Sequence, residues 1–339
     1  MRLRSLARIL VTGGGGFIGS HLAKFLHDRG HFVRVADLTL NGHASGKYFD
    51  EEMLLDLRVP ENCVKATKGI DHVYNLSANM GGIGFITQVG ADIMRDNLLM
   101  NVYMLDASRQ SRVKRYLFSS SACVYPEYRQ MGVMVAGLRE SDALPAEPDT
   151  FYGWEKLVAE KMCEAFAQDY DLDIRIVRYH NIYGPNGTYR GGREKSPAAL
   201  CRKVAQASDL GSITVWGDGE QTRSYCYIDD AVRGTVKLMD SDFAQPLNIG
   251  SDRLVTVNEL ADMIIRISGK RIRKVYDLSA PQGVRGRNAD ISLARRVLGW
   301  EPMVGLEEGL ANTYQWIAAR CVEDARENLS EPHKVIARP

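Results

Sequence analysis

Tyr152 and Lys156 are the two residues of this sequence whose types and spacing best suit proton transfer. On a helix, a separation of four residues places both side chains on one face, one turn apart. A phenol has a pKa of about 10 and is a poor base at neutral pH. Lys156 would supply the cation that stabilises a phenolate, so that Tyr152 could take the proton of a substrate hydroxyl while hydride leaves the same carbon. The alternative is an ordinary pair on a helix surface.

A third reactive side chain, Cys123, lies two residues after Ser121, where an apolar run ends in three serines. A thiol with an unperturbed pKa near 8.5 can remove a carbon-bound proton once an adjacent carbonyl has made that proton acidic. A nearby cation such as Lys195 would help. Inverting a stereocentre also requires a second group that returns a proton from the opposite face. Cysteine is among the most buried residue types, so the alternative is a thiol packed in the core.

The stretch 9–20 has the pattern of a strand, a tight glycine turn and a helix. Three of its glycines are spaced three apart, which lets the turn fold sharply, the backbone approach a pyrophosphate and the helix N-terminus face the phosphates. A second strand, 32–37, ends in Asp37, where an acid binds a ribose diol and would repel a 2′-phosphate. The pattern predicts an NAD site, against the alternatives of a flexible loop and a solvated acid. The residues expected at this cofactor are Gly13, Gly16, Phe17, Ile18, Gly19, Asp37, Asp56, Tyr152 and Lys156.

The composition bounds the class of protein. The chain has 339 residues, 45% of them hydrophobic, and a formal net charge of +1. These values favour a large core in two lobes and give no reason to expect nucleic-acid or membrane partners. With no apolar run of membrane-spanning length and no signal peptide pattern, we expect a cytoplasmic enzyme. The six cysteines form no C-x-x-C pair, and His180 has no partners at metal-ligand spacing, so we expect reduced thiols and no metal site.

Strands alternate with helices through the first half of the chain, which predicts an α/β fold with a doubly wound parallel sheet of the Rossmann type. The expected strands are 9–12, 32–37, 51–57, 71–78, 113–121 and 173–179, and the expected helices are 17–30, 92–110, 152–170, 196–208 and 306–319. We expect an NAD-binding domain of residues 1–185, to which 226–250 return, and a smaller discontinuous substrate-binding lobe of 186–225 and 251–323. Residues 324–339 are expected to form a polar tail.

The glycine turn, the serine before Val124-Tyr125 and the Tyr-x-x-x-Lys pair together resemble the extended short-chain dehydrogenase/reductase family of NAD-dependent nucleotide-sugar epimerases and dehydratases. The resemblance runs from about residue 9 to residue 317. Within the family it is closest to enzymes acting on GDP-linked mannose, and the segments that carry this likeness are 80–85, 119–127, 180–185, 191–195, 216–224 and 283–288. The sequence departs from the usual pattern at Gly15, usually alanine, and at Asn79, usually aspartate. Asn79 lies beside the expected sugar site and bears on substrate preference.

The resemblance implies a reaction cycle with no net redox change. NAD would oxidise the sugar at C4, with Tyr152 as base and Ser121 bonded to the same hydroxyl. Cys123 and Lys195 would act as base and acid at C5 and C3 before rereduction. The product from GDP-D-mannose would be GDP-L-galactose, with GDP-L-gulose as a candidate further product. In the family's 4,6-dehydratases the position of Cys123 holds a glutamate, and in its 4-epimerases commonly a threonine.

The resemblance also implies a binding set for a GDP-sugar substrate and a homodimer formed by the helices 92–110 and 152–170. The expected substrate-binding residues are Met80, Gly81, Asn181, Lys195, Trp216, Arg223, Arg285 and Arg287. The two last arginines suit bidentate binding of a diphosphate, although arginines are also common on surfaces, and Asn181 could simply tie a turn. Two other functions stay open: another nucleotide-sugar enzyme, either a 4-epimerase or a 4,6-dehydratase, and a non-catalytic NAD-binding regulator.

Overall fold

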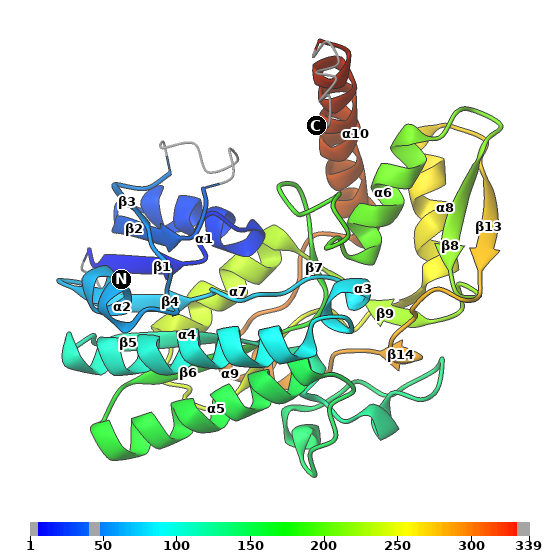
Figure 1. Ribbon diagram of the computed structural model, residues 1–339. Helices are drawn as coiled ribbons and strands as arrows, with labels where there is room; N and C mark the ends of the chain where they lie inside the picture. The colour runs from blue at the N-terminus through cyan, green and yellow to red at the C-terminus, as the bar shows by residue number, and fades with distance from the viewer. Residues whose placement is uncertain (1–5, 41–47, 331–339) are drawn as a thin grey trace, which may run out of the picture.

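A seven-stranded sheet forms the centre of the molecule in the computed structural model, which describes residues 6–40 and 48–330 (Figure 1). Every neighbouring pair in this sheet is parallel, so the predicted doubly wound α/β fold is confirmed. The strands, in spatial order, are β11 (Leu247–Ile249), β6 (Ile174–Tyr179), β5 (Arg115–Ser121), β4 (His72–Asn75), β1 (Arg8–Thr12), β2 (Phe32–Asp37) and β3 (Glu51–Leu54).

Helices cover both faces of the sheet. Along β1, Ile9 and Val11 belong to one hydrophobic core and Leu10 to another, because successive side chains of a strand point to opposite faces. The first core includes residues of α1 (Phe17–His27) and α7 (Ile228–Asp240), and the second includes residues of α2 (Pro60–Thr67), α4 (Gly90–Gln110) and α5 (Phe151–Tyr170). Both faces are therefore buried, as a parallel sheet requires.

A second group of elements packs beside the carboxyl ends of these strands. It contains three mutually packed helices, a parallel pair of strands and a three-stranded sheet (Figure 1). The helices are α6 (Ser196–Gln206), α8 (Val257–Ser268) and α10 (Leu306–Ser330), the pair is β8 (Ser212–Trp216) with β13 (Arg273–Asp277), and the sheet is β12 (Leu254–Thr256), β9 (Thr222–Ser224) and β14 (Gly286–Arg287). Lys270 Nζ joins two of the helices by donating to the carbonyls of Val204, Ala205 and Ala207 at the end of α6.

Short elements connect the two groups. They are α3 (Ile83–Ile86), α9 (Ser292–Leu298), the strand pair β7 (Ile182–Tyr183) and β10 (Cys226–Tyr227), and the 3₁₀ helices Ala122–Val124, Glu127–Arg129 and Glu140–Ala143. Residues 226–250 run through β10 and α7 to β11, which pairs with β6 at the edge of the large sheet. The two-lobe division stays a prediction, and this return of the chain supports it.

Several boundaries differ from those expected. The strand predicted at 51–57 ends at Leu54, because Asp56 turns the chain by accepting from the N–H of Arg58 at 2.9 Å. The strand predicted at 71–78 is only His72–Asn75. The closing helix is longer than expected, since α10 continues to Ser330 through the first residues of the predicted tail. The rest of that tail lies outside the described residues.

Candidate active site

Two adjoining cavities open at the carboxyl ends of the parallel strands, where ligands bind in folds of this class. The larger, of about 620 Å³, follows the glycine turn after β1 and the ends of β2, β4 and β5. The smaller, of about 340 Å³, lies between the end of β5 and the second group of elements. Ser121, Tyr152 and Lys195 line both cavities, so the candidate catalytic groups stand where the two meet.

The glycine turn after β1 leaves no room for side chains. Gly13 has a φ of +67°, and a Cβ there would lie 3.0 Å from the backbone of Leu76. A Cβ on Gly19 would lie 2.1 Å from the carbonyl oxygen of Gly13, inside the van der Waals limit. The turn therefore keeps its tight path only with glycine at both positions, and its residues line the larger cavity as expected, together with Phe17 and Ile18.

Asp37 lines the same cavity at the end of β2. Its carboxylate accepts hydrogen bonds from the N–H groups of Gly15 at 3.0 Å and Leu38 at 2.7 Å. Burial raises the pKa of Asp37, and these hydrogen bonds oppose the shift. Asp56, which we also expected at the cofactor, is not among the lining residues, and its hydrogen bonds with Arg58 lower its pKa. Arg58 lines the cavity instead, and sequence reasoning missed it.

Tyr152 and Lys156 stand in the first turns of α5, which begins after Thr150, whose side chain accepts from the N–H of Gly153. Tyr152 is 7% exposed and Lys156 1%, which excludes the alternative of a surface pair. Lys156 Nζ lies 5.6 Å from the centre of the Tyr152 ring and has no hydrogen-bond acceptor among the described residues. Burial raises the pKa of Tyr152, whereas a hydrogen bond with Ser121 lowers it.

Cys123 sits in the 3₁₀ helix that follows β5, and Ser121 Oγ caps this helix by accepting from the N–H of Cys123 at 3.2 Å. The thiol is partly exposed and lines the smaller cavity, so it is not a core cysteine. Arg287 Nη1 donates to Cys123 Sγ at 3.2 Å. The guanidinium also lies 3.6 Å from Asp149 and donates to Gln130 Oε1 at 2.5 Å. The arginine expected to hold a diphosphate is thus bonded to the thiol.

Lys195 immediately precedes α6, in extended backbone conformation. Lys195 is exposed, and the surface to which it is exposed is that of the two cavities, both of which it lines. This partial desolvation lowers the pKa of the amine, the neighbouring Arg287 lowers it further, and Cys123 opposes the shift. The amine and the thiol thus line one cavity from two different elements.

Most of the other expected substrate-binding residues line the smaller cavity, namely Met80, Gly81, Asn181, Trp216, Arg223 and Arg287. Arg223 donates to the carbonyls of Thr222 and Val284, both at 2.7 Å, and burial lowers its pKa to about 10. Asn181 donates to the carbonyl of Ser224 at 2.9 Å, so it also stabilises the turn in which it lies.

Arg285 is not brought to either cavity. It forms a bidentate pair with Asp218 at 2.8 Å. Gln221 and Lys203 line the smaller cavity but were missed from the sequence. Gln221 falls inside segment 216–224, which carries the family resemblance, and this could have identified it as a binding residue. The sequence offers only one sign for Lys203, its position about two helical turns beyond Lys195.

Neither metal-binding clusters nor membrane spans occur in the part of the chain that the structure describes. Within residues 6–40 and 48–330, no group of three or more His, Cys, Asp and Glu side chains could hold a metal ion. The helices of the same ranges are all too short or too polar to cross a membrane.

Comparison with known proteins links this site to a group of enzymes. Residues 9–250 match the NAD dependent epimerase/dehydratase family. The chain is 48% identical to GDP-mannose 3,5-epimerase of Arabidopsis thaliana over 311 residues, which cover 91% of this chain and 82% of the relative. It is 47% identical to GDP-mannose 3,5-epimerase 1 of Oryza sativa subsp. japonica over 311 residues, 91% of this chain and 81% of the relative.

Solved structures of other epimerases share the fold. UDP-glucose 4-epimerase of Thermotoga maritima, crystallised with UDP-glucose, superposes with a TM-score of 0.84 at 29% identity and covers 93% of this chain and 99% of its own. UDP-glucuronic acid 4-epimerase of Bacillus cereus, in complex with UDP-glucuronic acid and NAD, gives a TM-score of 0.80 at 27% identity and covers 92% and 99%.

Proposed function

Because the chain belongs to the NAD dependent epimerase/dehydratase family, we propose that it is an NAD-dependent isomerase that converts GDP-D-mannose to GDP-L-galactose by inverting C5 and C3, with GDP-L-gulose as a second product. One observation carries this proposal: the Cys123 thiol and the Lys195 amine line the same cavity, which Ser121 and Tyr152 also line. The similarity to two plant GDP-mannose 3,5-epimerases supports the choice of substrate.

The larger cavity fits NAD. A Cβ on Gly19 would lie 2.1 Å from the carbonyl oxygen of Gly13, so glycine keeps the tight path that lets the backbone approach a pyrophosphate, and Asp37 stands at the end of β2 for a ribose diol. Lys156 Nζ is buried with Glu155 Oε1 at 3.6 Å and makes no hydrogen bond to the described residues, so its N–H groups are available to a bound ligand. When bound there, NAD supplies the chemistry of taking up a hydride from the sugar and giving it back.

Tyr152 and Ser121 act at the C4 hydroxyl. Ser121 holds the hydroxyl oxygen, and Tyr152 accepts its proton as hydride leaves C4, so that C4 becomes a ketone. Lys156, one turn along α5, stabilises the phenolate in a site where burial otherwise disfavours it. At the end of the cycle Tyr152 returns the proton to the oxygen as C4 is reduced.

Cys123 and Lys195 act on the carbons beside the ketone. The ketone acidifies the protons at C5 and C3, and the Cys123 thiolate removes one while the electron pair moves onto the carbonyl oxygen as an enolate. Lys195 then donates a proton to that carbon from the opposite face. The hydrogen bond from Arg287 Nη1 supports this role, because it holds the Cys123 sulfur at the wall of the smaller cavity. A threonine or glutamate at this position would instead suit a 4-epimerase or a 4,6-dehydratase.

The chain's assembly and location are further parts of the proposal. We infer a homodimer built on α4 and α5, which pack side by side along one face of the sheet (Figure 1). The exposed apolar side chains of Trp154 and Val158, four residues apart on α5, support this contact. A cytoplasmic location stays an expectation from the sequence.

Product analysis with a panel of nucleotide sugars tests the function. GDP-, UDP- and dTDP-linked hexoses are incubated with the enzyme separately, and the sugar of each product is identified after hydrolysis. We expect galactose and gulose of the L series from GDP-mannose. A product inverted only at C4, a 6-deoxy-4-keto sugar, or turnover confined to the other nucleotides would contradict the proposal.

A further inference from the structure

We propose that Arg193 is a positioning residue for Lys195, which it fixes against the sugar site by binding Asn79 and Phe85. The inference rests on the proposed function, because it concerns the proton that Lys195 returns. Arg193 is an exposed residue that lies two positions before Lys195 and is hydrogen-bonded to another loop through Asn79. Its proposed role is in the step in which Lys195 returns the proton.

The backbone just before Lys195 has little conformational restraint at its two glycines. Residues 184–195 contain neither helix nor strand. Gly191 and Gly192 have φ values of +89° and +82°, and a Cβ at either would meet nothing within 4 Å. Glycine in open space leaves the backbone many accessible conformations. The position of Lys195 is therefore set by the contacts around it, namely α6 after it, the pair of Glu194 with Arg202 at 2.9 Å, and the contacts of Arg193.

Arg193 makes those contacts with the loop after β4. Its Nη1 donates to Asn79 Oδ1 at 3.2 Å and to the carbonyl of Met80 at 3.4 Å, and its guanidinium lies 3.8 Å from the centre of the Phe85 ring. The carbonyl of Arg193 also accepts from the N–H of Gly82 at 3.0 Å. Side chain and backbone thus hold the two loops together, with aromatic and charge-assisted contacts.

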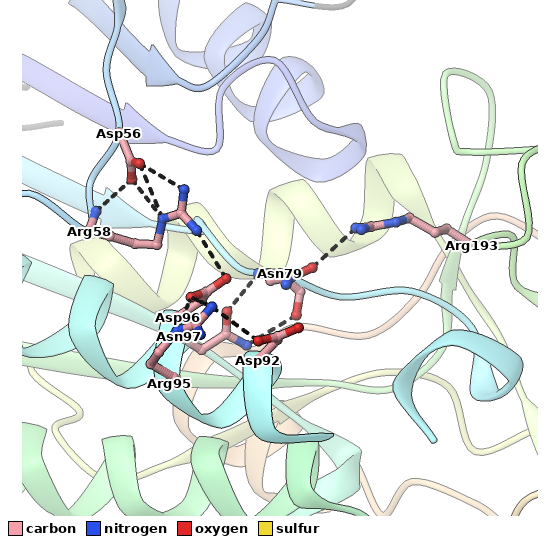
Figure 2. A network of polar contacts seen from close by, with 8 residues as sticks. All are labelled: Asp56, Arg58, Asn79, Asp92, Arg95, Asp96, Asn97 and Arg193. Carbon is pink, nitrogen blue, oxygen red and sulfur yellow. Dashed lines mark hydrogen bonds and ion pairs between the residues drawn. The ribbon is translucent and has the colours of Figure 1, made fainter. Parts of the chain in front are cut away.

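The other side of this contact is anchored in the core. Asn79 donates its N–H to Asn97 Oδ1 at 2.6 Å, and Asn97 Nδ2 donates to the Asn79 carbonyl at 3.2 Å and to Glu155 Oε1 at 2.8 Å. Asn97 and Glu155 are fully buried, and Glu155 precedes Lys156 on α5. Figure 2 shows Asn79 between Asn97 and Arg193. One chain of contacts therefore runs from the helix of Tyr152 and Lys156 to the loop of Lys195.

Neighbouring ion pairs stiffen the same turn of α4. Asp96, beside Asn97, is paired with Arg58 at 3.2 Å and with Arg95 at 2.8 Å, and Arg58 also binds Asp56 at 2.8 Å (Figure 2). The anchor is thus held from several sides, whereas Arg193 is exposed and its hydrogen bonds compete with water. Arg193 is therefore a member of this chain of contacts that can be changed without altering a buried side chain.

Loss of this contact should separate proton removal from proton return. Cys123 is held by a different element and by Arg287, so it should still remove a proton from the ketone intermediate. With Lys195 displaced, the carbon regains a proton more often from the Cys123 side, without inversion. In heavy water, Arg193→Gln should therefore place deuterium at C5 of recovered GDP-mannose, and its rate of inverted product should fall about 10- to 100-fold, with KM changing less than kcat.

Variants at both ends of the contact complete the experiment. Arg190→Gln is the matched control, since Arg190 is an exposed arginine of the same segment that pairs with Asp324. It should behave as the parent enzyme. Asn79→Ala should reproduce Arg193→Gln, the double variant should be no worse than either single one, and Asn79→Asp should keep or raise the inversion rate by adding charge to the contact.

The possible outcomes keep this inference apart from the proposed function. Parallel loss of deuterium uptake and inversion in Arg193→Gln, or an effect as large in Arg190→Gln, would overturn the role of Arg193. Additive losses in the double variant would also overturn it. A parent enzyme that places no deuterium at C5 or C3 would instead remove the proposed function.

Discussion

Lys156 and Lys195 show how surroundings give the same side chain two different tasks. Lys156 is buried with its Nζ 3.6 Å from Glu155 Oε1, beside a tyrosine ring. Its place one turn along α5 from Tyr152 suits the proposed role of stabilising a phenolate. Lys195 is exposed to the cavities, and partial desolvation there together with Arg287 lowers the pKa of its amine. A lowered pKa suits a group that must give up a proton during each cycle.

The lowered pKa of Lys195 predicts where activity declines in alkali. Lys195 must carry its proton to act as an acid, so turnover falls as the pH rises through its pKa. Because that pKa lies below the ordinary value of 10.5, the decline should begin at a lower pH than for an exposed lysine. In Lys195→Arg, the guanidinium stays protonated, so any residual activity should lose this limb. The check is the pH dependence of kcat for both proteins, and an unchanged alkaline limb in the variant would assign it to another group.

At the residue scale, the sequence predicted what depends on local spacing. The glycines of the first turn, the Tyr152 and Lys156 pair and Cys123 all reach the cavities because strand ends and helix turns fix their direction. Arg287 lines the smaller cavity as expected, but its hydrogen bond to Cys123, 164 residues away in the chain, has no signal in the sequence. A side chain's charge indicates which ligands it can bind, but not which neighbour the fold brings to it first.

At the scale of elements, the close approach of α5 to the 3₁₀ helix Ala122–Val124 aligns the catalytic groups. Gly153 makes this approach possible, since a Cβ there would lie 2.1 Å from the carbonyl oxygen of Cys123. Tyr152 on one element and Cys123 on the other are thereby held at a fixed spacing. The sequence pattern predicted the helix that contains Tyr152, but it gave no sign of the 3₁₀ helix Ala122–Val124 or of the contact between the two backbones.

Gly153→Ala should therefore impair catalysis. The added methyl group must push the start of α5 away from the 3₁₀ helix, and misplacement of about 1 Å at a catalytic centre costs on the order of 10²-fold in rate. Steady-state kcat with GDP-mannose measures the loss, with thermal unfolding recorded in parallel. Gly305→Ala, where nothing lies within 4 Å of the added Cβ, is the control and should keep its activity. A fully active Gly153→Ala enzyme would show that this spacing is not required.

Element boundaries were the weaker part of the sequence interpretation. Strand β3 is shorter than expected because Asp56 and Arg58 form a local turn instead of continuing the ladder. Helix α10 is longer because its polar C-terminal part still finds partners, including the Tyr189 hydroxyl that donates to Asp324 at 2.8 Å. Hydrophobic periodicity does not register such polar contacts.

At the scale of the whole molecule, the larger cavity lies at the carboxyl ends of the sheet strands, and the smaller cavity lies between the end of β5 and the second group of elements. The alternation of strands and helices sufficed to predict the parallel sheet, whereas the two-lobe division stays a prediction. The exposed apolar face of α5 then points to a partner. Phe151, Trp154 and Val158 are 63%, 39% and 41% exposed in the single chain, and a second copy would cover them.

Val158→Glu should accordingly weaken the homodimer. A charge buried in an apolar contact is costly unless it is paired, so the variant should sediment as a monomer at concentrations where the parent is a dimer. Val322→Glu on α10, where the valine is 51% exposed, is the matched control and should stay dimeric. Analytical ultracentrifugation distinguishes the two states, and dissociation by the control alone would place the interface elsewhere.

The central claim is that a transient ketone at C4 lets the Cys123 thiolate exchange the hydrogens at C5 and C3. Its most direct test follows deuterium from heavy water into GDP-mannose and its products by mass spectrometry and NMR. The parent enzyme should label both carbons. Cys123→Ala should retain bound NAD, but its rate of deuterium labelling at each carbon should fall by more than about 10²-fold. Undiminished labelling in Cys123→Ala would contradict the account.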